Sequence, residues 1–153
     1  MPYLHLVIKE VLRLYPSVPV NSREAVRLTT LPVGGGPDGQ SPVLVHPGEG
    51  VGYCVYAMHR RKDIYGQDAD KFRPERWEDH SLDDIGWAYL PFNGGPRLCL
   101  GQEFALLVVA YTVARLVQLY PKIELPPDES AAEIGKEKQV LTLSGGPNTF
   151  RYN

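Results

Sequence analysis

Two long stretches of the chain have apolar residues at helical spacing. From Tyr3 to Tyr15 these residues form a single stripe, which Pro16 helps to close. From Gly101 to Tyr120, with Pro121 just beyond, they cover nearly the whole circumference. A helix that is apolar on all sides must be buried on all sides, and one short helix with a small sheet is too little to do that. The pattern therefore predicts that a further surface covers the second helix.

The sequence between these helices has the pattern of short strands and turns. Residues 23–28 alternate between polar and apolar, and residues 43–45 and 51–57 are rich in β-branched and aromatic side chains. We expect these three strands to form one small sheet, with Cys54 in its core. The glycine-rich and proline-rich stretch 31–41 is expected to be a turn-rich connection.

Further short strands are expected after the second helix. Residues 123–125 have a strand pattern, and residues 139–143 are expected to pair with residues 149–152 as a hairpin. Residues 79–89 are expected to be irregular, with Trp87 and Tyr89 as anchors.

Composition and charge exclude several classes of protein. Of 153 residues, 43% are hydrophobic and 22% charged, with a formal net charge of −2, which describes one ordinary soluble domain. This balance does not suggest a nucleic acid or an acidic ligand as a partner. Cys54 and Cys99 form no Cys-x-x-Cys pair, which argues against a zinc site or a disulfide framework and favours a reducing compartment.

The chain shows no pattern of a targeting or membrane segment. Residues 1–6 resemble neither a signal peptide nor an anchor. The longest apolar run, residues 104–114, is shorter than the ~20 residues that a membrane span requires. We therefore expect no spanning segment in this chain.

The loop of residues 92–101 has the features of a metal ligand site. Gly94 and Gly95 allow the chain to turn tightly, and Pro96 stiffens the turn. Cys99 lies just ahead of a predicted helix, where unpaired backbone N–H groups face an anion. A thiolate held by several backbone donors is a good soft ligand for iron.

The neighbours of Cys99 decide between this interpretation and a simpler one, because a lone cysteine is most often a small buried hydrophobe. Gly101 and Ala105 lie on one side of the helix and are small enough to let a flat macrocycle approach the backbone. Arg97 lies two residues before the sulfur and offers forked donors to a carboxylate.

The spacing Phe92-x-x-Gly95-x-Arg97-x-Cys99-x-Gly101 resembles, at every fixed position, the heme-binding signature of the cytochrome P-450 (heme-thiolate monooxygenase) superfamily. The resemblance implies a mainly α fold with small β-sheets that binds heme (iron protoporphyrin IX). By the same resemblance Cys99 is the catalytic residue and proximal iron ligand, Arg97 pairs with a heme propionate, and Phe92 packs beside the sulfur.

A second motif of the family has a counterpart here. Glu10 and Arg13 are neighbours on the first helix, and an arbitrary pair of this kind is usually an exposed ion pair worth ~0–1 kcal/mol. Residues 72–77 resemble the family motif whose arginine joins a buried Glu-Arg-Arg network, which assigns that role to Arg76. Loss of one member would leave a buried charge uncompensated, at a cost of ~3–5 kcal/mol.

The resemblance also implies a substrate pocket and a second arginine for the heme. Residues just after the first helix enter the pocket above the heme, so Val18 and Val20 would line an apolar site, although two valines alone more often mean ordinary core. Arg23 would reach the second propionate. Leu141 in the C-terminal hairpin would be a further contact with the substrate.

Residues 59–63, His-Arg-Arg-Lys-Asp, place three cations together. They are expected to form either a contact surface for an acidic partner or a solvated helix start.

The activity implied by the resemblance is insertion of one oxygen atom of O₂ into a C–H bond of an apolar substrate, because thiolate ligation of heme iron favours O–O cleavage. Electrons would come from NADPH through a separate flavoprotein reductase. Residues 34–39 and 56–66 are similar to the fungal branch that hydroxylates long-chain alkanes and fatty acids. The resemblance implies that full-length relatives are anchored in the endoplasmic reticulum membrane, facing the cytosol, and we expect no such anchor within residues 1–153.

The resemblance covers nearly all of this chain but only the C-terminal part of the longer family members. Residues 1–153 are therefore expected to be the C-terminal heme-binding portion of a single larger domain whose N-terminal part, with its oxygen-activating helix, is absent. Two alternatives stay open: a truncated, non-catalytic remnant that binds heme weakly or not at all, and a heme-thiolate isomerase or dehydratase that needs no reductase.

Overall fold

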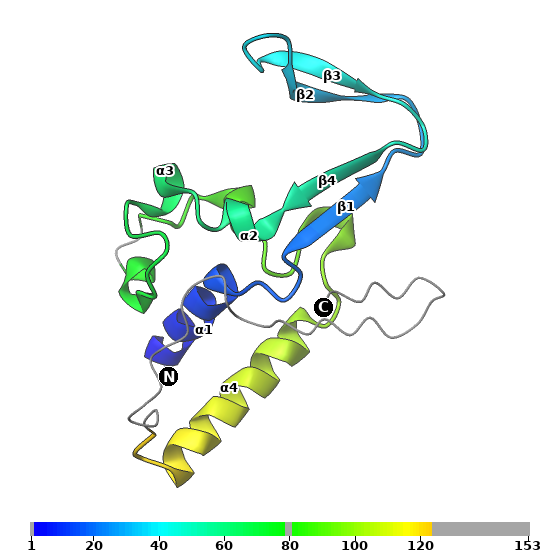
Figure 1. The fold of residues 1–153 in the computed structure, drawn as a ribbon. Helices are drawn as coiled ribbons and strands as arrows, with labels where there is room; N and C mark the ends of the chain where they lie inside the picture. The colour runs from blue at the N-terminus through cyan, green and yellow to red at the C-terminus, as the bar shows by residue number, and fades with distance from the viewer. Residues whose placement is uncertain (1, 79–80, 124–153) are drawn as a thin grey trace, which may run out of the picture.

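The computed structural model describes residues 2–78 and 81–123. In chain order (Figure 1) its elements are α1 (Pro2–Leu14), β1 (Val20–Glu24), β2 (Thr29–Gly35), β3 (Ser41–Val45), β4 (Gly50–Cys54), α2 (Val55–Met58), α3 (Lys62–Tyr65), the 3-10 helices η1 (Pro74–Trp77), η2 (Gly86–Ala88) and η3 (Gly95–Arg97), and α4 (Gln102–Leu119). Helices combined with small antiparallel sheets are the fold class predicted from the sequence.

Helix α1 is the helix predicted from the first apolar stripe, and it ends just before the proline that was expected to close it. Ile8 and Leu14 of the stripe are buried, and so are the charged residues Glu10 and Arg13. The buried side of this helix is therefore part apolar and part ionic.

The strands form two separate two-stranded antiparallel sheets, so the prediction of one sheet was wrong. β1 pairs with β4, and β2 pairs with β3. The β2–β3 hairpin therefore lies between β1 and β4 along the chain. Figure 1 shows the two pairs as a bent ribbon, with β2 and β3 projecting away from the helices.

The strand predicted over residues 23–28 was wrong beyond Glu24, where β1 ends. The residues opposite the continuation form a turn, in which the Glu49 N–H donates to the His46 carbonyl (3.1 Å). Ala25 still exchanges backbone hydrogen bonds with Glu49 (2.9 Å) and Gly48 (2.8 Å), but the turn ends the regular ladder there, and Val26 is 91% exposed. Alternation alone does not show whether a strand has a partner to pair with.

Two other element boundaries differ from the prediction. β2 runs to Gly35, so much of the stretch 31–41 is one side of a hairpin. β4 ends at Cys54, where the predicted strand over 51–57 gives way to α2. Cys54 is exposed and not in the core, because its sulfur caps α2 by accepting a hydrogen bond from the Ala57 N–H (3.4 Å).

The buried centre of the described residues lies between α1 and the segment from α2 to η1. Its apolar members are Ile8, Leu14, Val55, Tyr65 and Ala69, whereas Val45, which is also buried, belongs to β3. Four polar side chains are buried with them: Glu10, Arg13, His59 and Arg76. Buried charges require partners, so this part of the fold depends on polar contacts as well as on apolar packing.

Helix α4 is the long apolar helix predicted from the sequence, and the described part of the chain buries none of its residues. Phe104, for example, is 73% exposed. With 18 residues and a mean hydropathy of 1.3, α4 is long and apolar enough to cross a membrane. The expectation of no spanning segment, which rested on the short apolar run 104–114, therefore does not hold for the whole helix. Its length and composition are weak evidence for a span, since the core helix of a soluble protein has the same properties.

The C-terminal strands predicted from the sequence lie outside the described residues, apart from Ile123. Leu141, the expected substrate contact, lies outside them as well.

Candidate functional site

The loop of residues 92–101 is closed by its own backbone. The N–H of Cys99 donates to the carbonyl of Phe92 (2.9 Å), and η3 fills the turn between them. The N–H of Gln102 then donates to the carbonyl of Cys99 (3.3 Å). Cys99 therefore lies directly between a tight loop and the first residue of α4.

Gly94 and Gly95 are both needed, for different reasons. Gly95 has φ +64°, a backbone conformation that residues with a side chain rarely adopt. Gly94 is extended, but a Cβ there would lie 2.5 Å from Cζ3 of Trp87. Trp87 thus packs its ring against the backbone of the loop, although 67% of its surface is exposed.

Cys99 is a free and exposed thiol. Three large apolar neighbours in the chain, Leu98, Leu100 and Phe104, are exposed as well. Side chains of this kind are normally buried, so the surface around the sulfur fits an apolar covering group. A soft sulfur donor within an apolar surface suits a heme iron better than a hydrated metal ion, and the described residues contain no other cluster that could hold a metal.

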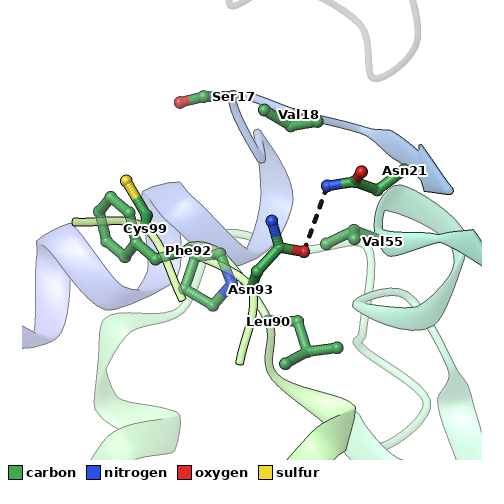
Figure 2. Close-up of a pocket in the computed structure, with 9 residues that line it drawn as sticks. Ser17, Val18, Asn21, Val55, Leu90, Phe92, Asn93 and Cys99 are labelled. Carbon is green, nitrogen blue, oxygen red and sulfur yellow. Dashed lines mark hydrogen bonds between the residues drawn. The ribbon is translucent and has the colours of Figure 1, made fainter. Parts of the chain in front are cut away.

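A cavity of about 210 Å³ opens beside Cys99 (Figure 2). Its wall includes Val18, Asn21, Val55 and Cys99 together with residues 90–93. Phe92, expected beside the sulfur, lines the same cavity as Cys99. Of the two valines expected in the substrate pocket, Val18 lines the cavity, whereas Val20 does not line it and is 62% exposed.

The two arginines expected at the heme propionates come from different elements, Arg23 from β1 and Arg97 from η3. Arg23 uses only Nη1 for hydrogen bonds within the described residues, to Oδ1 of Asn21 (3.2 Å) and the carbonyl of Ser22 (2.7 Å). The Arg97 side chain is exposed and has no hydrogen bond or ion pair with any described residue. Both guanidinium groups therefore have donors available for a ligand that carries two carboxylates.

Gly101 and Ala105 lie at the start of α4, where the Ala105 N–H donates to the Gly101 carbonyl (2.8 Å). Gly101 is the N-cap residue, and a Cβ there would lie 4.0 Å from the sulfur of Cys99. The backbone next to the sulfur is thus free of side chains, which suits the close approach of a flat ring.

Glu10, Arg13 and Arg76 meet in the buried centre. Oε1 of Glu10 accepts hydrogen bonds from Nη2 of Arg13 (2.8 Å) and Nε of Arg76 (2.9 Å), and Oε2 accepts one from Nε of Arg13 (2.9 Å). The Arg73 backbone N–H and the Trp77 indole N–H complete the set, each at 3.0 Å. Burial alone would raise the pKa of Glu10, but the hydrogen bonds from Arg13, Arg73 and Arg76 outweigh it and lower the pKa.

The same two arginines hold the segment that follows α2. Nη1 of Arg13 donates to the carbonyls of His59 (2.7 Å) and Ala69 (2.6 Å), and Nη1 of Arg76 donates to that of Tyr65 (2.8 Å). None of the three network residues lines the cavity. Their contacts therefore serve the fold that supports the loop, and they take no direct part at the sulfur.

His59, which precedes the three cations of residues 59–63, is a buried residue. Of those cations, Arg61 and Lys62 are exposed at the start of α3, as expected for a solvated helix start. His59 is 0% exposed, and its Nδ1 donates to the carbonyl of Arg13 (3.0 Å) while its Nε2 accepts the N–H of Leu90 (2.8 Å). The next residue, Arg60, is largely covered and lies 3.5 Å from the centroid of the Tyr56 ring. The basic residues that follow His59 in the sequence did not indicate that His59 itself is a buried, neutral residue.

Asn93 is a second residue that the sequence analysis missed. It is the one described non-glycine residue with a positive φ (62°). The sequence feature that could have indicated the turn at Asn93 is the dipeptide Asn93-Gly94, because Asn-Gly is typical of turns.

A free cysteine ahead of a helix, an apolar cavity beside it and two arginines with available donors define a candidate heme-thiolate site. The sequence profile described as Cytochrome P450 matches residues 1–149. The chain belongs to the cytochrome P450 family. Members of this family hold heme through a cysteine thiolate, so heme, the cofactor predicted from the sequence, is confirmed for the family.

The relatives include several fungal proteins. The chain is 70% identical over 144 residues to a cytochrome P450 of Arthroderma benhamiae, and this alignment covers 94% of this chain and 29% of the relative. It is 56% identical over 126 residues to cytochrome P450 52A6 of Candida tropicalis (82% of this chain, 24% of the relative). It is 49% identical over 150 residues to cytochrome P450 52A5 of Candida maltosa (98% and 28%). The predicted place in a fungal branch is thereby confirmed, and the chain spans less than a third of each relative.

Among solved structures, the fold is similar to that of a retinoic acid bound cyanobacterial cytochrome P450, CYP120A1. The two align with a TM-score of 0.65 and 37% sequence identity, over 77% of this chain and 26% of the other. This similarity confirms that the described elements are part of the cytochrome P450 fold.

Proposed function

We propose that this chain supplies the heme-ligand portion of a monooxygenase that inserts one oxygen atom of O₂ into a C–H bond of an apolar substrate. The observation that carries the proposal is Cys99, a free, exposed thiol directly ahead of α4 and beside a cavity with apolar walls. A thiolate-bound heme supplies the O–O cleavage. The protein supplies ligation, orientation and exclusion of water.

The proposed cofactor contacts follow the geometry of the loop and of β1. Cys99 holds the iron, and the available donors of Arg97 and Arg23 bind the propionates. Gly101 and Ala105 leave room for the macrocycle at the start of α4. Phe92 and Gly95 shape the loop, and Glu10, Arg13 and Arg76 hold the scaffold beneath it.

The proposed substrates are apolar, with a long-chain alkane or fatty acid as the specific candidate. Support comes from the fungal relatives and from the cavity wall, to which Val18 contributes. Val20 follows Val18 closely in the same segment and is proposed as a second contact. Leu141 is retained as a further contact, outside the described residues.

Electron supply and location are part of the same proposal. Electrons come from NADPH through a separate flavoprotein reductase, and the full-length protein lies at the endoplasmic reticulum membrane on its cytosolic face. Family membership supports both statements.

The two cysteines provide a matched test, because both are free and exposed. In the complete heme-loaded protein, Cys99→Ser should abolish the red-shifted Soret band of the thiolate-ligated ferrous–CO complex, because only Cys99 ligates iron. Cys54→Ser should keep that band. The reverse result would remove the ligand assignment, and a wild-type protein without the band would remove the proposed function.

For the isolated chain of residues 1–153, a second function is favoured by a specific observation: no residue of α4 is buried by the described residues. We propose that this polypeptide alone is a non-catalytic remnant that binds heme weakly or not at all. Hemin added to the purified chain should give no stable red-shifted band after reduction and exposure to CO. A stoichiometric, stable band would contradict this second proposal.

A further inference from the structure

One side-chain oxygen joins the ligand loop to the β1–β4 pair. Oδ1 of Asn93 accepts hydrogen bonds from Nδ2 of Asn21 (3.2 Å) and from the hydroxyl of Tyr53 (2.8 Å). Asn21 on β1 and Tyr53 on β4 are direct partners in the antiparallel register, so their side chains leave the same face of the pair. Figure 2 shows the Asn21–Asn93 contact beside the cavity.

Arg23 belongs to the same cluster. Its Nη1 donates to Oδ1 of Asn21 (3.2 Å), the residue whose amide nitrogen donates to Asn93. Its guanidinium also lies over the ring of Tyr53, 5.6 Å from the centroid. The Arg23–Asn21 and Asn21–Asn93 hydrogen bonds follow one another, so a continuous set of contacts runs from the Arg23 guanidinium to the ligand loop.

Asn93 is also coupled to Cys99 through the backbone. It follows Phe92 directly, and the Phe92 carbonyl accepts the N–H of Cys99 (2.9 Å). The positive φ of Asn93 (62°) turns the chain at this point, a conformation that asparagine tolerates better than most residues. Movement of Asn93 would therefore shift the carbonyl to which Cys99 is bonded.

We propose that Asn93 is a positioning residue that sets the placement of the Cys99 sulfur relative to the Arg23 guanidinium. The inference rests on the proposed function, because a cofactor held by a thiolate at one point and by carboxylates at another requires both anchors at a fixed separation. One acceptor shared by two strands and located in the loop provides that constraint.

Two substitutions of Asn93 distinguish the effect of its side-chain oxygen from the effect of its backbone conformation, and a third removes one of the donors. Asn93→Gly keeps the positive φ available and removes the acceptor. Asn93→Asp keeps an acceptor for both donors and also tolerates the positive φ. Tyr53→Phe removes one of the two donors while keeping the ring beneath Arg23.

In the complete heme-loaded protein, Asn93→Gly should speed the transfer of heme to excess apomyoglobin roughly tenfold, the effect of losing two partly buried hydrogen bonds. It should also lower the fraction of the ferrous–CO complex that shows the thiolate-type Soret band. Asn93→Asp should stay within about twofold of wild type, since its acceptor remains. Adding Tyr53→Phe to Asn93→Gly should have no further effect, because the shared acceptor is already gone.

Wild-type protein and Cys99→Ser are measured in parallel. If wild type shows the thiolate band and Asn93→Gly matches wild type in both readouts, the positioning role is overturned and the proposed function stands. Equal losses in Asn93→Gly and Asn93→Asp would also overturn it, since the acceptor oxygen would then not matter. If wild type lacks the band, the proposed function fails and this inference fails with it.

Discussion

Arg13 and His59 each hydrogen-bond to the backbone of the other. Nη1 of Arg13 donates to the His59 carbonyl at 2.7 Å, and Nδ1 of His59 donates to the Arg13 carbonyl at 3.0 Å. Because Nδ1 carries the proton, Nε2 is able to accept, and it takes the N–H of Leu90 (2.8 Å). Leu90 lies two residues before Phe92, so His59 links α1 to the segment that leads into the ligand loop.

This arrangement requires a neutral imidazole, since a protonated Nε2 cannot accept a hydrogen bond. Burial is the largest cause that lowers the pKa of His59, to about 4, and the positive charges of Arg13 and Arg60 lower it further, against an opposing effect of the hydrogen bond to the Arg13 backbone. In the unfolded chain the pKa is near the ordinary value of 6.5. The unfolded state therefore binds the proton more tightly, and native stability is lost as the pH falls from about 6.5 to about 4.

We expect the thermal midpoint of the heme-loaded protein to fall across this pH window and His59→Gln to remove most of the slope. The neutral amide cannot take up a proton, so the linkage disappears, at a cost of ~1 kcal/mol near neutral pH for an imperfectly replaced hydrogen bond. Differential scanning calorimetry at several pH values measures both effects.

His5→Gln is the matched control, because His5 lies on the same helix and is exposed. Its slope should equal that of wild type. Glu10 contributes only at the acidic end of this window, since its pKa is lowered from 4.5 and its stabilising effect is lost as the pH falls below that value, so the slope at higher pH reports on His59. A His59→Gln protein with the wild-type slope would show that another group is responsible.

Arg76 and Arg73 should respond very differently to the same substitution. Arg76 is 2% exposed and donates to Glu10 and to three backbone carbonyls. The three donors of lysine cannot reproduce this fork, so Arg76→Lys should leave buried acceptors unsatisfied, destabilise the protein by ~1–3 kcal/mol or more and reduce the yield of heme-loaded protein. Arg73 is half exposed and pairs with Asp68 (2.9 Å), so Arg73→Lys should cost less than ~1 kcal/mol. Equal decreases in thermal stability for Arg76→Lys and Arg73→Lys would show that the buried network contributes no more to stability than the exposed ion pair.

These contacts also show how far the sequence alone could predict the site. Glu10 and Arg13 could be paired, because residues three apart on a helix are neighbours. Arg76 contacts Glu10 across 66 positions, a distance that no local spacing reveals, and only the family motif suggested it. His59 could not be assigned to the core, since its burial depends on carbonyl and amide groups contributed by Arg13 and Leu90.

The fold shows the same division between local and long-range information. Helices α1 and α4 could be predicted because their apolar spacing is a property of the segment itself. The end of β1 at Glu24 could not, because it depends on the turn formed by the opposite strand. The capping role of Cys54 also depends on the helix that follows it.

Val18 and Val20 should influence where the substrate is oxidised. Phenylalanine at position 18 adds bulk to the cavity wall, so the ratio of oxidation products from a long-chain fatty acid should change, and phenylalanine at position 20 tests the proposed second contact. Val26→Phe is the control, because Val26 is a valine on the bend of the β ribbon and is 91% exposed. Product analysis by gas chromatography measures the ratio. Identical profiles for all three variants would remove Val18 and Val20 from the proposed substrate pocket.

Gly94 should be sensitive to the smallest possible enlargement. A Cβ at this position would lie 2.5 Å from Cζ3 of Trp87, and the indole can relieve that contact only by moving away from the loop. Gly94→Ala should therefore cost ~1–3 kcal/mol by overpacking and should lower the fraction of the ferrous–CO complex with the thiolate-type band. Gly50→Ala is the control, since Gly50 lies in β4 with no atom within 4 Å of its Cβ position.

Trp87→Ala provides the decisive comparison for this glycine. If the clash is the cause, adding Gly94→Ala to Trp87→Ala should produce no further loss of thermal stability, because the ring that blocks the new methyl group is gone. Such non-additivity would identify the indole as the wall against which the loop is held. If Gly94→Ala is equally harmful in both backgrounds, the effect lies in the backbone of the loop, and Trp87 does not position it.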